Sequence, residues 1–73
     1  MGSRSRMVRQ TQQQLKVLGF KPGPLDGYFG AKTRSAILRF QSENTLPLSG
    51  TADYRTLIAL QEAYDMKTGS LAP

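Results

Sequence analysis

The ionisable side chains set the first limit on what chemistry this chain could do. The sequence contains neither histidine nor cysteine. Nucleophile pairs built on those residues therefore cannot form, and a zinc site would need carboxylates alone. The remaining catalytic option is a pair of carboxylates flanking a scissile bond, as glycosidases use. The candidates for such a pair are Asp26, Glu43, Asp53, Glu62 and Asp65.

Each of these carboxylates also has a structural interpretation. Asp26 precedes Gly27, where its side chain can hydrogen-bond the backbone amides of a tight turn. Asp53 falls in the first turn of an expected helix, which the helix dipole favours. The others lie near expected helix ends among polar neighbours. A domain this small also offers little room for a deep cleft, so we predict no enzyme activity, no metal site and no cofactor.

Two basic residues, Lys32 and Arg55, lie near the expected starts of two helices. The helix dipole disfavours positive charge at such a position. However, the free backbone amides of a helix start can bind an anion, and an adjacent cation adds charge. We therefore predict that Lys32 and Arg55 bind an anionic ligand, the alternative being that both side chains are merely solvated.

Two tyrosines, Tyr28 and Tyr54, are the other candidates, because an aromatic face packs on apolar surface while its hydroxyl stays wet. Tyr28 is followed by Phe29 in a stretch that we expect to be extended. Successive side chains of an extended segment point to opposite faces. If Phe29 lies in the core, Tyr28 points outward. The alternative for both tyrosines is a partly buried position at the rim of the core.

These four residues belong to two copies of one segment. Aligning Thr33 with Thr56 places Gly27 on Gly50 and Lys32 on Arg55, an offset of 23 residues. Each copy has the pattern of a tight glycine turn followed by an amphipathic helix, a unit that cannot bury its own apolar face. The two threonines can return their hydroxyls to the backbone of the preceding turn.

The apolar pattern predicts three helices at about residues 7–18, 31–43 and 52–64. Gly19 suits a left-handed cap after the first helix, and Thr51 suits the N-cap of the third. The fold class is therefore all-α, a small three-helix bundle with two long loops and the internal turn-helix repeat. The expected interior consists of Val8, Leu15, Leu18, Phe20, Leu25, Phe29, Ile37, Phe40, Leu46, Leu48, Leu57, Leu60 and Tyr64.

Three segments are expected along the chain. Residues 1–6 have the composition of a disordered leader, residues 7–66 form the domain, and residues 67–73 are a flexible tail or linker. The net charge of +5 falls to +3 without the first six residues, which favours anionic partners in general. No apolar run is long enough to span a membrane, and no signal peptide is visible.

Four motifs follow one another along the chain, namely Gln10-x-x-x-Gln14-Leu15-x-x-Leu18-Gly19-Phe20, Asp26-Gly-x-Phe-Gly-x-x-Thr33, Phe40-Gln41, and Gly50 with Thr56-Leu57 and Leu60. Taken in order, these motifs resemble the three-helix type of peptidoglycan-binding domain found in bacterial and phage cell-wall hydrolases. The resemblance covers about residues 8–64. It departs from the family in a Pro-rich loop at residues 21–24, in Thr45 where a glycine is common, and in Ala52 where the first repeat has Phe29.

The resemblance implies a non-catalytic module, acting outside the cytoplasm, that anchors an attached enzyme or envelope protein on peptidoglycan. Tyr28 and Tyr54 would then contact the glycan strand, and Lys32 and Arg55 the carboxylates of the stem peptide. A helix-turn-helix domain that binds nucleic acid is one alternative, but residues 53–65, at the expected third helix, carry a single Arg against three acids. A protein-docking module is a second alternative and stays open.

Overall fold

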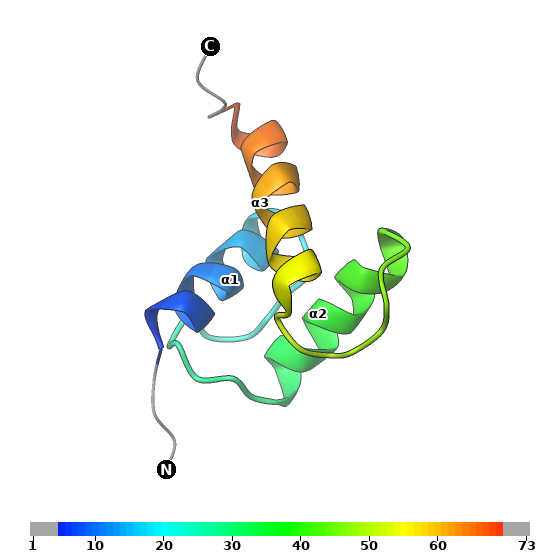
Figure 1. The fold of residues 1–73 in the computed structure, drawn as a ribbon. Coiled ribbons are helices and arrows are strands. Elements are labelled where there is room, and N and C mark those ends of the chain that lie inside the picture. Colours follow the sequence, from blue (N-terminus) through cyan, green and yellow to red (C-terminus); the bar gives the residue numbers. More distant parts are fainter. Residues whose placement is uncertain (1–4, 70–73) are drawn as a thin grey trace.

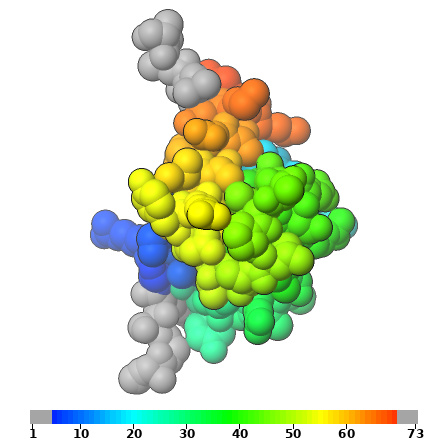
Figure 2. All heavy atoms as spheres, turned by 45° about the vertical axis from the view of Figure 1, so that its right-hand side comes forward, coloured from blue at the N-terminus to red at the C-terminus, as the bar shows by residue number. Residues whose placement is uncertain are grey.

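The computed structural model describes residues 5–69, which form three α-helices joined by two long loops (Figure 1). The helices are α1 (Arg6–Val17), α2 (Ala31–Glu43) and α3 (Tyr54–Thr68). The first of them, α1, packs against both α2 and α3. On the face shown in Figure 2, the loop between α2 and α3 lies at the surface beside both helices. The prediction of an all-α three-helix fold is confirmed.

The core is small and draws on all three helices. Leu15 of α1, three residues of α2 and Leu60 of α3 are almost completely buried. The ring of Phe20, in the first loop, meets the ring of Phe40 edge to face, with centroids 5.6 Å apart. The buried apolar residues are Leu15, Ala36, Ile37, Phe40 and Leu60, with Leu18, Phe20, Leu46, Ala52, Ala59 and Ala63 packed around them.

Two residues expected in the interior lie on the surface instead. Leu48 is 63% exposed and Phe29 is 38% exposed. In the second loop Leu46 packs against the core as expected, and its amide donates to the Gln41 carbonyl oxygen at the end of α2, whereas Leu48 does not reach the core. Phe29 lines a surface depression together with Leu38 and other residues of α2.

The start of α1 lies one residue earlier than predicted. Ser5 is its N-cap and accepts a hydrogen bond from the Val8 amide through its hydroxyl. The Ser5 amide also donates to the Gly27 carbonyl oxygen at 2.9 Å. Ser5 and Arg6 therefore belong to the fold, contrary to the expected leader, whereas residues 1–4 lie outside the described part. At the other end, Gly19 has the left-handed conformation predicted for it.

The start of α3 was also predicted wrongly. Its N-cap is Asp53 and not Thr51, because the Asp53 carboxylate accepts from the Thr56 amide at 2.9 Å. The helix then continues to Thr68, four residues beyond the predicted end. By contrast, α2 has the predicted bounds. Among the described residues, no helix combines the length and apolar character needed to cross a membrane.

Candidate functional site

A buried glutamine of α1 holds the first turn of the repeat. Gln12 is 1% exposed, and its amide nitrogen donates to the Tyr28 carbonyl oxygen and to the Thr33 hydroxyl, both at 3.0 Å. The same nitrogen lies 3.3 Å from a carboxylate oxygen of Asp26. In return, the Gly27 amide donates to the side-chain oxygen of Gln12 at 2.9 Å. A single side chain therefore fixes the turn that presents Tyr28.

Gln41 of α2 does the same for the second turn. Its amide nitrogen donates to the Thr56 hydroxyl at 2.8 Å and to the Thr51 carbonyl oxygen at 3.1 Å. It also donates to the Ser49 hydroxyl, while the Gly50 amide donates to its side-chain oxygen at 3.1 Å. The sequence repeat is therefore a structural repeat in which a glutamine from the preceding helix closes each turn.

The repeated threonines have a structural role, but their hydroxyls form hydrogen bonds with other groups than the predicted backbone of the preceding turn. The Thr33 hydroxyl accepts from Gln12 and donates to the Pro22 carbonyl oxygen at 3.1 Å. The Thr56 hydroxyl accepts from Gln41. Neither of these bonds runs to the glycine turn itself. The sequence analysis did not predict that these two glutamines are buried. Their spacing could have indicated it, because Gln12 lies four residues after Val8 and Gln41 four residues after Ile37, on the apolar face of each helix.

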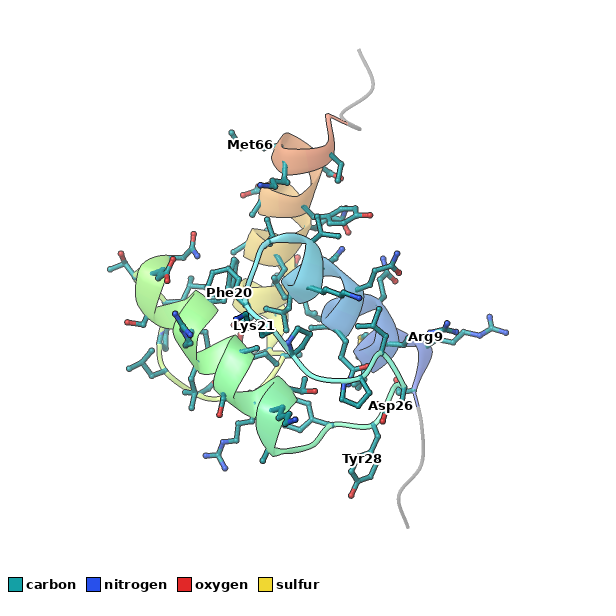
Figure 3. The ribbon with its side chains drawn as sticks, turned by 180° about the vertical axis from the view of Figure 1, so that it is seen from behind. Arg9, Phe20, Lys21, Asp26, Tyr28 and Met66 are labelled. Carbon is teal, nitrogen blue, oxygen red and sulfur yellow. The ribbon has the colours of Figure 1, made fainter. Side chains whose placement is uncertain are left out.

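The first turn brings together two of the predicted site residues. Tyr28 is 50% exposed and points away from the body of the domain (Figure 3). With Lys32 it lines a shallow depression of about 210 Å³, here called the loop groove. The stem of Lys32 lies across Gly23, where an added Cβ would come 3.1 Å from the Lys32 Cβ. The remaining residues of the loop groove are Pro22, Pro24, Asp26, Gly30, Ala31 and Thr33.

A second depression adjoins the loop groove and holds an aromatic residue and a cation that were not predicted as site residues. This flank groove, of about 480 Å³, is lined by Phe29, Arg34, Ser35 and Leu38 and shares Gly30 and Ala31 with the loop groove. Tyr28 and Phe29 thus occupy adjoining grooves, each beside one basic residue. Phe29 was missed because its type and position indicated a core residue.

The carboxylate of Asp26 takes the structural role predicted for it, because one of its oxygens accepts from the Tyr28 amide at 2.9 Å. Glu43 and Glu62 are exposed, and Asp65 accepts from the Gln61 side chain. Within residues 5–69, no three carboxylates lie together as a group that could hold a metal ion.

The predicted residues of the second repeat do not join this site. Tyr54 is 78% exposed at the first position of α3, and neither it nor Arg55 lines the loop groove or the flank groove. The pKa of Asp53 is lowered, mainly by the hydrogen bonds from Thr56 and Ser49, and the nearby Arg55 charge lowers it further. The Arg55 charge therefore acts on the carboxylate that caps α3.

Comparison with known families gives this geometry a context. Residues 4–60 match the family described as "Putative peptidoglycan binding domain", and that range contains both turns and both glutamines. The chain belongs to this family. The match confirms the resemblance inferred from the motifs. No solved structure matches the chain significantly.

Several proteins that are similar in sequence to this chain are much longer than it is. The carboxy-terminal processing protease CtpB of Bacillus subtilis is 38% identical over 60 residues, which are 82% of this chain and 12% of that protein. The protein described as "Putative OxPP cycle protein OpcA" of Synechococcus elongatus is 45% identical over 53 residues, which are 73% of this chain and 12% of that protein. The spore cortex-lytic enzyme of Bacillus cereus is 37% identical over 94% of this chain and 27% of the enzyme. The chain therefore spans between about an eighth and about a quarter of these relatives.

Proposed function

We propose that this domain binds peptidoglycan through the loop groove and the flank groove, without catalysing a reaction. The observation that carries the proposal is the pair of exposed aromatic residues, Tyr28 and Phe29, in adjoining grooves with Lys32 and Arg34 beside them. Aromatic faces pack on the apolar C–H surfaces of sugars, and cations attract carboxylates. Peptidoglycan presents sugars and carboxylates on one polymer.

A modest affinity is sufficient for such a domain if it is attached to another one. Contacts made by exposed residues such as Tyr28 and Lys32 are individually weak because water competes for them. Tethering raises the local concentration of an attached domain near its polymer, even when each contact is weak. We therefore propose that the domain anchors an enzyme or envelope protein outside the cytoplasm. The length of the relatives, one of them named a spore cortex-lytic enzyme, supports this role.

Co-sedimentation with purified peptidoglycan sacculi tests the proposal through two matched pairs of variants. Tyr28→Ala and Lys32→Ala are each expected to weaken binding about 3- to 10-fold, since each removes one aromatic or ionic contact. Tyr54→Ala and Arg55→Ala make the same chemical changes in the second repeat and are expected to change binding less than about 2-fold.

Two results would contradict the proposal. One is retention of the wild-type domain in the supernatant, and the other is equal loss of binding in both pairs of variants. Tight binding of duplex DNA that falls steeply with salt would instead favour the nucleic-acid alternative.

A further inference from the structure

A third depression is lined by residues of α1 and α3 and includes neither Tyr28 nor Phe29. This α1–α3 groove has a volume of about 370 Å³. Two arginines line it, no carboxylate does, and the other lining side chains are carboxamides and a phenol. An anion in this groove would therefore meet two positive charges and several hydrogen-bond donors, with no carboxylate among the lining residues to repel it. The lining residues are Arg6, Arg9, Gln10, Gln13, Gln14, Gln61 and Tyr64.

The wall between the two helices is held in place before any ligand arrives. Gln14 is only 5% exposed, and its amide nitrogen donates to the side-chain oxygen of Gln61 at 3.0 Å. The Gln61 amide nitrogen in turn donates to the Asp65 carboxylate at 2.9 Å. This chain of bonds orients the two carboxamides, so little side-chain entropy is lost when a ligand binds against them.

The α1–α3 groove is connected to the loop groove through shared residues. Arg6 and Arg9 also line a neighbouring depression of about 400 Å³, together with Asp26. Asp26 in turn lines the loop groove beside Tyr28. Figure 3 shows Arg9, Asp26 and Tyr28 following one another along one edge of the molecule. An extended ligand on Tyr28 could therefore continue along this edge to the α1–α3 groove.

We propose that the α1–α3 groove is a second subsite, which binds the carboxylate-bearing peptide portion of the polymer whose sugars lie on Tyr28 and Phe29. This inference rests on the proposed function. Arginine forks bind carboxylates with two parallel hydrogen bonds. The carboxamides of Gln10 and Gln13 both donate and accept, which matches the N–H and C=O groups of a peptide.

Calorimetric titration with a synthetic stem peptide that carries no sugar tests the subsite directly. The wild-type domain is expected to bind this peptide, and the double variant Arg6→Gln/Arg9→Gln to bind it at least about 5-fold more weakly. Arg39→Gln is the matched control, since Arg39 is exposed on α2 and lines none of the grooves described here. Its affinity for the peptide is expected to equal that of the wild type.

A second variant keeps the test decisive if the glutamine variant is less stable. The variant Arg6→Lys/Arg9→Lys retains both positive charges but lacks the guanidinium groups that form two parallel hydrogen bonds with a carboxylate. It is expected to bind the peptide with intermediate affinity. Wild-type affinity in both double variants would overturn the subsite. A poly(glycerol phosphate) chain that binds the groove more tightly than the peptide would overturn the assignment to a peptide.

The two proposals fail in different ways. If the domain binds sacculi but not the free peptide, and the Arg6→Gln/Arg9→Gln variant binds sacculi as the Arg39→Gln variant does, the second subsite is overturned and the proposed function stands. If the domain does not bind sacculi at all, the proposed function fails, whatever the result with the peptide.

Discussion

At the scale of single residues, Gln12 and Gln41 explain why two different turns adopt one structure. Each turn presents a glycine amide, which needs an acceptor, and a threonine hydroxyl, which takes a donor. A carboxamide supplies both from one side chain. A glutamate in the same place would lack the donor and, at position 12, would put a second negative charge beside Asp26.

Removing the Gln12 side chain is expected to destabilise the domain more than any exposed substitution on α1. Gln12→Ala leaves the buried Gly27 amide without its acceptor and opens a cavity, at a cost of about 2–4 kcal/mol in the free energy of unfolding. Urea denaturation measures this difference. The adjacent exposed residue provides the control, because Gln13→Ala should change the free energy of unfolding by less than about 0.5 kcal/mol. Equal effects of the two substitutions would show that the glutamine network contributes little to stability.

The cap of α3 predicts how stability depends on pH. Hydrogen bonds from Thr56 and Ser49 lower the pKa of Asp53 in the folded state, below its ordinary value of about 3.9. The stability contributed by this carboxylate is thus fully present above that ordinary value and is lost as the pH falls through the lowered pKa. Asp53→Asn, which keeps one acceptor for the Thr56 amide, should lose less stability between pH 7 and about pH 3 than the wild type does. Urea denaturation at both pH values measures this, and parallel losses would contradict it.

At the scale of secondary-structure elements, the first turn and the start of α1 form one unit. The Ser5 amide bonds the Gly27 carbonyl oxygen, while a Cβ added at Gly27 would lie 2.8 Å from the Ser5 carbonyl oxygen. Gly27 also has a positive φ of 77°, which glycine adopts at little cost. This contact leaves no room for a side chain, so the loop that presents Tyr28 and the helix that presents Arg6 and Arg9 are coupled.

Two glycine substitutions distinguish the energetic cost of this close contact from the cost of backbone strain. Gly19 also has a positive φ, of 91°, but an added Cβ would meet nothing within 4 Å. Gly19→Ala should therefore cost about 1 kcal/mol in the free energy of unfolding, whereas Gly27→Ala should cost at least about 1 kcal/mol more. Thermal or urea denaturation measures both. Indistinguishable values would show that the start of α1 yields to the added methyl group.

The bounds of the helices could be predicted with different success, because the flanking sequence marks some helix ends more clearly than others. Gly30 and Asn44 flank an unambiguous apolar stripe, and α2 has the predicted bounds. The start of α3 was misplaced because two nearby residues, Thr51 and Asp53, could each serve as its N-cap. Local pattern does not show that Ser49 and Gln41 hold Thr51 in the preceding turn, which leaves the cap to Asp53.

The candidate site was predicted only in part, for a similar reason. Tyr28 and Lys32 were found because they are surface-type residues within the turn that the sequence repeats, and the structure places both in one groove. Phe29 was assigned to the core because residue type usually decides such an assignment. Gln12 lies in a run of three glutamines at residues 12–14, so residue type alone could not show that Gln12 and Gln14 are buried while Gln13 is exposed.

At the scale of the whole molecule, the domain depends on very few apolar contacts. A globular chain of 73 residues has a free energy of unfolding of about 4–11 kcal/mol. Phe40 is the largest of the fully buried side chains, and it also contacts the ring of Phe20. Most of the stability is therefore concentrated in a small cluster between the three helices.

Truncation of the central aromatic residue is accordingly expected to unfold a large fraction of the domain. Phe40→Ala should cost about 3–5 kcal/mol in the free energy of unfolding, which is a large share of the total. Circular dichroism against temperature measures the loss. Leu48→Ala is the control, since that side chain is 63% exposed and its removal should leave the melting temperature nearly unchanged. A melting temperature of Phe40→Ala close to that of the wild type would contradict the small-core description.

The binding surface itself can be located in one experiment, by following the backbone amide resonances of the domain during titration with a soluble disaccharide-peptide fragment of peptidoglycan. The largest shifts are expected in residues 22–35, which form the loop groove and the flank groove, with smaller shifts in the first half of α1. Shifts centred on Tyr54 and Arg55, with residues 22–35 unchanged, would contradict the location of the site, and no shifts at all would contradict the proposed function.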